Sequence, residues 1–75
     1  MDKNIIGENA GKIWHLLGSR NEKWEYEELK KASGLPDRDL AAAIGWLARE
    51  DKVQFYTDRN GGKDYLYLVL NFYIG

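Results

Sequence analysis

The chain has 75 residues, which is enough for one small domain and too few for a second hydrophobic core. Apolar residues make up 44% of the sequence and aromatic residues 13%, so a disordered chain is excluded. The absence of cysteine excludes disulfides and thiolate metal sites, and a net charge of −1 argues against a broadly basic, nucleic-acid-binding surface. There is no signal-peptide pattern and no apolar run of transmembrane length, which predicts a soluble cytoplasmic protein.

The first periodic segment predicts a helix over residues 5–19, with Asn4 as its N-terminal cap. A second line of residues along this helix is unusual, because each glycine inside a helix costs about 1 kcal/mol relative to alanine. It indicates either close packing inside the monomer, with Gly18 as C-terminal cap, or a smooth groove for a second subunit anchored by Trp14. The apolar stripe is Ile6, Ala10, Ile13, Leu16 and Leu17, and the unusual line is Gly7, Gly11, Trp14 and Gly18.

A polar loop over residues 19–23 should lead into a very short strand, because Trp24-Glu25-Tyr26 alternates apolar and charged residues. A second helix should begin near Tyr26, where the acidic residues suit the helix dipole although none is a preferred cap. Leu29 and Ala32 should face the core, and Lys30 and Lys31 should face water. Gly34 should adopt the left-handed conformation that ends the helix.

A third helix should follow the turn Ser33-Gly34-Leu35, because Pro36 is tolerated at or just before a first helical turn. We expect it to end near Glu50 or Asp51. Its predicted buried stripe is Leu40, Ala43, Ile44, Leu47 and Ala48.

The remainder predicts a β-hairpin with strands over residues 53–57 and 65–70. Two type I′ turns are possible, Asn60-Gly61, which sets Phe55 opposite Leu66, or Gly61-Gly62, which sets Phe55 opposite Leu68. The two registers differ by two residues and so agree on which side chains share a face. The predicted inner face is Val53, Phe55, Leu66, Leu68 and Leu70, and the predicted outer face is Gln54, Tyr56, Tyr65, Tyr67 and Val69.

The outer face is rich in tyrosine, and an apolar tail follows it over residues 71–75. Contiguous exposed aromatic residues usually mark an interface. The pattern indicates either a surface for self-association or a partner, or a tail that folds back over its own domain.

The residues of common catalytic and metal sites are sparse. His15 is the single histidine, and zinc needs three or four ligands. Ser19 and Ser33 fall at helix ends with no base to activate them. Gly61 and Gly62 precede no helix, which excludes a phosphate-binding loop. We therefore expect no enzyme activity, metal, cofactor or small-molecule substrate.

Three runs of residues carry a family resemblance: 6–17 (IGENAGKIWHLL), 28–35 (ELKKASGL) and 43–52 (AIGWLAREDK). They resemble a family of short, functionally uncharacterised bacterial winged helix-turn-helix proteins, most specifically in GENAGKIW and IGWLARED. The resemblance extends to about Leu70. It implies a winged-helix fold and dimers, and it implies no ligand, target sequence or catalytic residue.

The predicted fold is therefore α+β, a single winged helix-turn-helix domain over residues 1–75. It has three helices, a short strand after the first helix and a C-terminal β-hairpin wing. The fold favours a DNA-binding or transcription-regulatory role. However, residues 36–51 carry two arginines against four carboxylates, a net charge of −2 on the presumed reading helix. The candidate nucleic-acid contacts, mostly to the DNA backbone, are Lys30, Lys31, Arg38, Arg49, Arg59 and Lys63.

The alternative is a homodimeric protein-interaction module that binds no nucleic acid. The smooth surface of Ala41, Ala42 and Gly45, with Trp46 beyond it, could accept a protein partner. Trp46 could instead pack under the wing. Whichever function holds, we expect a homodimer formed through Trp14, the outer face of the wing and the tail. The candidate interface residues are Gly7, Gly11, Trp14, Trp46, Tyr56, Tyr65, Tyr67, Phe72 and Tyr73.

Overall fold

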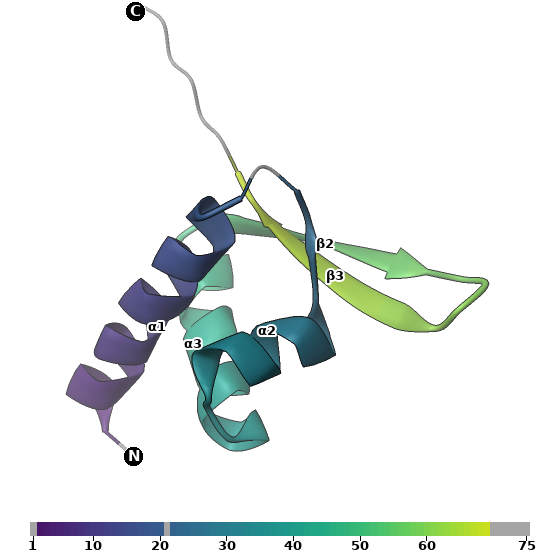
Figure 1. Ribbon diagram of the computed structural model, residues 1–75. Coiled ribbons are helices and arrows are strands. Elements are labelled where there is room, and N and C mark those ends of the chain that lie inside the picture. The colour runs from purple at the N-terminus through teal and green to yellow at the C-terminus, as the bar shows by residue number, and fades with distance from the viewer. Residues whose placement is uncertain (1, 21, 70–75) are drawn as a thin grey trace, which may run out of the picture.

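The computed structural model describes residues 2–20 and 22–69. Three helices pack around one core, and a three-stranded antiparallel sheet adds a long hairpin that projects from them (Figure 1). The strand order β1-β3-β2 makes β3 the central strand. This is the predicted α+β winged-helix architecture. The elements are α1 (Lys3–Gly18), β1 (Trp24–Glu25), α2 (Tyr26–Ser33), α3 (Asp37–Arg49), β2 (Val53–Asp58) and β3 (Lys63–Leu68).

Helix α1 begins and ends at other caps than the sequence pattern predicts. The carboxylate of Asp2 accepts a hydrogen bond from the Ile5 N–H at 2.9 Å, so Asp2, not Asn4, is the N-terminal cap. At the other end, Ser19 is the cap in place of Gly18, and its hydroxyl donates to the Leu16 carbonyl at 2.6 Å. A side chain that reaches the free backbone groups therefore decides both ends.

Helix α2 begins at Tyr26 as predicted, but it has a side-chain cap that the sequence did not suggest. The Glu25 carboxylate accepts from the Glu27 N–H at 2.8 Å, and the Glu28 carboxylate accepts from the Glu25 N–H at 3.3 Å. This reciprocal arrangement is a capping box built from two glutamates.

The C-terminal half of α2 confirms one prediction and corrects another. Gly34 ends the helix in the left-handed region with φ of +72°, as predicted. Ala32 is exposed, and Ser33 is buried in its place. The Ser33 hydroxyl can be buried because it donates to the Lys30 carbonyl and accepts from the Leu35 N–H.

Helix α3 starts directly after Pro36 and ends at Arg49, slightly before the predicted end. Asp51 then adopts a left-handed φ of 57°, and the Lys52 N–H donates to the Leu47 carbonyl at 2.9 Å, which closes the helix. The predicted apolar stripe is buried apart from Ala48, which is half-buried against the core. The rest of the core comes from the other elements: Ala10, Ile13, Leu17, Trp24, Leu29, Val53 and Leu66.

The hairpin adopts the first of the two predicted registers, with Phe55 opposite Leu66 and Asp58 opposite Lys63. The connection is not a two-residue type I′ turn. It comprises residues 59–62, with only Gly62 left-handed at φ of +67° and its N–H donating to the Asp58 carbonyl at 2.7 Å. The predicted short strand is also confirmed, because Trp24 pairs with Leu66 on the other side of β3.

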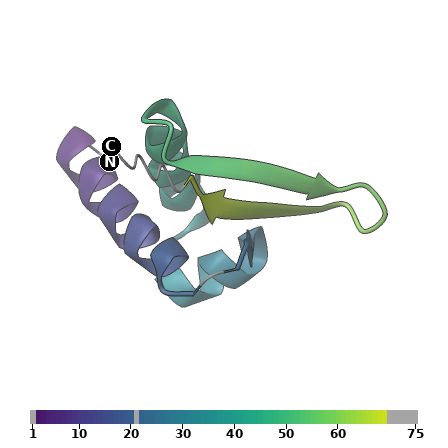
Figure 2. The same ribbon diagram turned by 90° about the horizontal axis from the view of Figure 1, so that it is seen from above.

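The inner face of the hairpin is only partly covered, which corrects one prediction. Val53 and Leu66 are buried, but Phe55 is 51% exposed although it shares their face. The reason is that β2 is an edge strand and the wing projects beyond the helices (Figure 2). The predicted inward position of Leu70 lies outside the described residues.

Candidate nucleic-acid interface

The turn between α2 and α3 holds a polar cluster around Asp37, the first residue of α3. The Lys30 ammonium lies 3.1 Å from one carboxylate oxygen of Asp37, and the Tyr26 hydroxyl donates to the other at 3.0 Å. The hydrogen bond from Lys30, followed by that from Tyr26, holds the pKa of Asp37 below its ordinary value. Burial, with the neighbouring carboxylate, raises the pKa of Tyr26.

This cluster alters the charge balance of the presumed reading helix. The negative charge of Asp37 is offset by an ammonium group that the sequence places on another helix. The repulsion expected from the net charge of residues 36–51 is therefore smaller than the sequence count indicates. The Lys30 ammonium is engaged in this partly exposed ion pair and is therefore less free to contact a phosphate.

The solvent-facing side of α3 carries one regular stripe. Arg38, Ala42, Gly45 and Arg49 follow one another at spacings of four, three and four residues, which places them on one side of a helix. Both arginines are exposed, and a Cβ atom added at Gly45 would meet no atom of the described part of the chain within 4 Å. The two arginine Cα atoms are about 16 Å apart along the axis, given a rise of 1.5 Å per residue. Between them no side chain of the stripe is larger than a methyl group.

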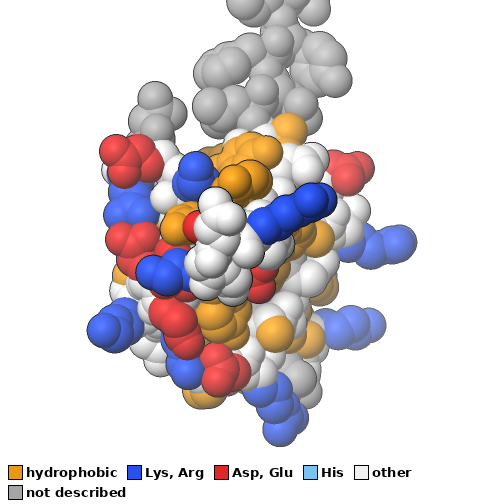
Figure 3. Space-filling model, turned by 90° about the vertical axis from the view of Figure 1, so that its right-hand side faces the viewer, with side chains coloured by type: hydrophobic (Ala, Val, Ile, Leu, Met, Phe, Trp, Pro, Cys, Tyr) orange, Lys and Arg blue, Asp and Glu red, His pale blue; other side chains and the backbone are white. Residues whose placement is uncertain are grey.

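The other predicted cationic contacts lie on different elements. Lys31 is exposed on α2, Arg59 lies in the connection at the tip of the wing, and Lys63 opens β3 opposite Asp58. Seen along the wing, acidic and basic side chains alternate on one side of the molecule, whereas those that project on the other side are mostly basic (Figure 3). The predicted residues thus form a dispersed set on α2, α3 and the wing.

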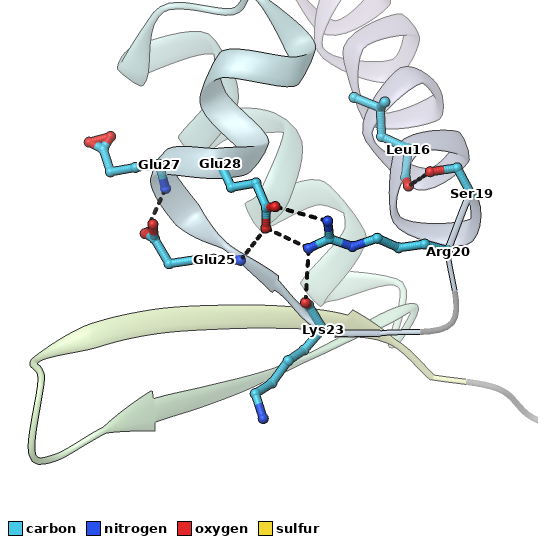
Figure 4. Close-up of polar contacts among 7 residues, drawn as sticks. All are labelled: Leu16, Ser19, Arg20, Lys23, Glu25, Glu27 and Glu28. Atoms are coloured by element: carbon cyan, nitrogen blue, oxygen red, sulfur yellow. Dashed lines mark hydrogen bonds and ion pairs between the residues drawn. The ribbon is translucent and has the colours of Figure 1, made fainter.

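A second polar cluster, which the sequence did not suggest, joins the loop before β1 to α2. The Arg20 guanidinium donates to both carboxylate oxygens of Glu28 and to the Lys23 carbonyl, and it lies 4.0 Å from the centre of the Trp24 ring (Figure 4). The hydrogen bond from Arg20 lowers the pKa of Glu28. Arg20 and Glu28 lie eight residues apart, in the loop before β1 and in α2, so no helical or strand periodicity of the sequence predicts the pair. Its role is structural, because it holds β1 against α2.

Two tryptophans form an apolar surface on α1 and α3. Trp14 is 43% exposed and Trp46 is 42% exposed. A Cβ atom added at Gly7 would lie 3.8 Å from the Trp46 ring, so this ring lies along α1 and does not pack under the wing. His15 is exposed and stacks edge-on against Trp14, with 5.5 Å between the ring centres.

The glycines on one side of α1 were predicted either to pack inside the monomer or to form a groove for a second subunit, and they do not all behave alike. Gly7 faces the Trp46 ring, and a Cβ atom at Gly18 would lie 3.4 Å from Leu68, so both serve packing inside the monomer. Among the residues that the structure describes, none lies within 4 Å of a Cβ atom added at Gly11. Only this middle position leaves room for something further.

The outer face of the wing carries the three predicted tyrosines. Tyr56 and Tyr67 are exposed, and Tyr65 is half-buried. The Lys23 ammonium lies 5.1 Å from the centre of the Tyr56 ring and 5.3 Å from that of Tyr65, within the range of a cation–π contact. Phe72 and Tyr73, also predicted for an interface, lie outside the described residues.

Within residues 2–20 and 22–69, no three side chains of the His, Cys, Asp or Glu type gather closely enough to hold a metal ion. None of the described helices combines the length and apolar character needed to span a bilayer.

Comparisons with known proteins place this architecture in context. Residues 1–68 match the model of the family described as winged helix-turn-helix domain (DUF2582). An uncharacterized protein of Methanocaldococcus jannaschii is 47% identical over 49 residues, which is 64% of this chain and 70% of that protein. The solution NMR structure of a Bacteroides thetaiotaomicron protein is similar with a TM-score of 0.78 and 35% identity, covering 100% of this chain and 93% of that one.

A third similarity is to a much longer protein. The main hemagglutinin component type C of Clostridium botulinum C phage is 33% identical over 70 residues, or 89% of this chain. The chain spans only 24% of that protein's length, so the name of that component describes far more than the matched segment.

Proposed function

Because the chain belongs to the winged helix-turn-helix domain family, we propose that it binds duplex DNA through α3 in a transcription-regulatory role. The exposed stripe that begins at Arg38 and ends at Arg49 carries this proposal. Its two guanidinium groups suit the phosphates on either side of a major groove about 12 Å wide. The small residues Ala42 and Gly45 let the helix backbone approach the base edges closely.

The same stripe predicts how selective the binding is. Reading a base edge needs Arg, Lys, Asn, Gln or another polar group that can reach it. Arginines at the two ends of the stripe favour phosphate contacts, and Ala42 and Gly45 donate no side-chain hydrogen bond to a base. We infer binding that depends strongly on salt and weakly on sequence.

The Asp37 cluster supports the approach of α3 to the phosphates. The Lys30 ammonium offsets the charge of the Asp37 carboxylate at the N-terminal end of the helix, where it would otherwise repel DNA, and the Tyr26 hydroxyl donates a hydrogen bond to the same carboxylate. The exposed cations Lys31, Arg59 and Lys63 are proposed as additional backbone contacts, from α2 and from the wing.

The test is a titration of random-sequence duplex DNA at two salt concentrations, with Arg38→Gln and Arg49→Gln as single variants. Each variant should weaken binding for every sequence and reduce the slope of log K against log salt concentration by about one. Lys12→Gln is the matched control, because Lys12 is an exposed cation on α1, outside the proposed contact surface. Absence of binding at low salt would contradict the proposal.

Self-association is a second candidate, favoured by the aromatic outer face of the wing and the free edge of β2. Tyr56 and Tyr67 are exposed on that face, and within residues 2–20 and 22–69 β2 pairs with another strand on one side only. An exposed edge strand is a ready template for pairing with another chain. The mass in solution at micromolar concentration tests it: a dimer that Tyr67→Glu dissociates supports the candidate, and a monomeric unmodified chain excludes it.

A further inference from the structure

The outer edge of β2 presents backbone groups that do not bond to β3. The Val69 N–H donates to the Lys52 carbonyl at 3.0 Å, so these two residues form a hydrogen-bonded pair of the antiparallel ladder. Hydrogen-bonded and non-hydrogen-bonded pairs alternate along such a ladder. The even-numbered residues of β2 therefore bond to β3. The odd-numbered residues direct their N–H and C=O groups to the other edge, which no described strand occupies: Val53, Phe55 and Thr57.

This edge lacks the features that usually protect an edge strand from pairing with another chain, which are proline, a bulge or a charge along the strand. Residues 53–57 contain neither a proline nor a charged residue, and the pairing with β3 is continuous from residue 53 to residue 58. Residues 54–57 are all exposed, because the wing projects beyond the helices (Figure 2). A further strand can therefore reach the edge.

The charges at the two ends of the edge are complementary under a two-fold rotation. Lys52 lies three residues before Phe55, and Asp58 lies three residues after it. When two copies of β2 pair antiparallel with Phe55 opposite Phe55, each Lys52 faces Asp58 of the other copy. This is a non-hydrogen-bonded pair, in which opposite side chains are closest. The neighbouring symmetric registers, centred on Val53 or Thr57, satisfy the same backbone groups but form no such ion pair.

The same register covers the aromatic ring that the helices leave in solvent. Phe55 is 51% exposed although it lies on the inner face of the sheet. With Phe55 opposite Phe55, the two Cα atoms are about 5.5 Å apart, and cross-strand aromatic pairs at this separation stabilise a sheet. Every other residue also stays on its own face, because the register shift is even.

We propose that two copies of the chain associate through their β2 edges, paired antiparallel and centred on Phe55, so that the two three-stranded sheets become one continuous sheet. This proposal rests on the self-association candidate above and assigns it one surface and one register. The backbone hydrogen bonds supply affinity, and the two Lys52–Asp58 contacts select the register. The fold of each chain does not depend on the contact, so the single chain keeps its stability where the protein is too dilute to associate.

The first test removes one backbone donor of the edge. The Thr57 N–H points away from β3, so Thr57→Pro removes a hydrogen bond between copies and none within the hairpin. Thr57→Ala is the matched control, because both variants lose the hydrogen bond from the Thr57 hydroxyl to Asp64. Sedimentation equilibrium at micromolar concentration should show dimers for the unmodified chain and Thr57→Ala, and monomers with unchanged helical circular dichroism for Thr57→Pro.

The outcomes of this test separate the register from self-association itself. A dimeric Thr57→Pro variant would place association on another surface and would overturn this proposal, while the self-association candidate would stand. A monomeric unmodified chain would overturn both.

The second test is specific to the register and does not need a proline in the strand. Lys52→Glu and Asp58→Lys each set like charges opposite one another at both ends of the edge, so each variant alone should associate about tenfold more weakly. An equal mixture of the two variants restores opposite charges at both ends. Native mass spectrometry should then show mostly mixed dimers. Lys12→Glu, on α1, is the control and should leave association unchanged. A mixture without enrichment of mixed dimers would overturn the proposal.

Discussion

The two strands that flank β3 differ in length and in what holds them. β1 has two residues and β2 has six, and both place an aromatic side chain next to Leu66 in the same row of the sheet. Trp24 on the short strand is buried, whereas Phe55 on the long strand is 51% exposed. The shorter strand is therefore the better integrated of the two.

The cause is the position of each strand relative to the helices. β1 runs directly into α2 and is fastened by the Arg20–Glu28 pair, with the guanidinium stacked on Trp24. β2 meets the helices at Val53 and then extends into the wing. Burial thus follows from the elements that cover a strand, and strand length or aromatic content does not predict it. The difference in burial between β1 and β2 leads to measurable differences in stability.

The largest expected effect is on the β1 side. Trp24→Ala should lower the free energy of unfolding by about 3–5 kcal/mol, because it removes a large buried ring and the platform for Arg20. Urea unfolding measures this, and Trp24→Phe should retain part of the stability. A loss of no more than about 0.5 kcal/mol, the usual range of a surface site, would mean that β1 is not integrated in the core.

The row across the sheet offers a direct comparison. Leu66 is 1% exposed, so Leu66→Ala should cost about 2–5 kcal/mol of unfolding free energy. Phe55→Ala, on the directly opposite residue, should change it by no more than about 0.5 kcal/mol, as expected at an exposed site. The same urea titration measures both variants. Equal losses would indicate that the wing folds against another surface in solution.

A substitution at the tip of the wing should have a moderate effect on stability. Gly62→Ala forces a left-handed φ of +67° on a residue with a side chain, which costs about 1–2 kcal/mol. Gly45→Ala is the matched substitution inside α3, where space is open and alanine is preferred by up to about 1 kcal/mol. The two variants should therefore shift the thermal midpoint in opposite directions. A shift of the same sign would contradict the left-handed assignment at the tip.

The smallest effect concerns pH and the pair that fastens β1. The pKa of Glu28 is lower in the folded chain than in the unfolded chain, because Arg20 donates to the carboxylate. The stability from this pair is thus fully present above the ordinary glutamate pKa and is lost as the pH falls through the folded-state pKa. Unfolding free energies at neutral pH and near pH 3 should differ less for Glu28→Gln than for the unmodified chain. An unchanged pH dependence would show that the pair is not maintained in solution.

Local sequence patterns predicted a large part of this fold. The period of the apolar residues located three helices and the buried faces of α1 and α3, and Gly34 marked the end of α2 because its backbone conformation favours a residue without a side chain. The strand alternation assigned the two faces of the hairpin, and the register proved to be one of the two that the turn residues allowed. These features depend on neighbours along the chain.

The candidate site was less predictable, because it depends on residues that are distant in sequence. The cationic and aromatic residues could be named, but not that Lys30 offsets Asp37 or that Trp46 lies along Gly7. Pairs such as Arg20 and Glu28 follow no helical or strand period, so a single sequence contains no signal for them.

The sequence by itself determined the three helices, the three strands, most of their faces and the winged-helix order. Only the tertiary structure decided which of those faces is covered and which charges are paired. The physical reason is that periodicity is a property of a segment, whereas burial and charge pairing depend on what a second segment brings against it. Phe55 and Leu66 share one face and one row of the sheet, and only the surrounding elements bury one and expose the other.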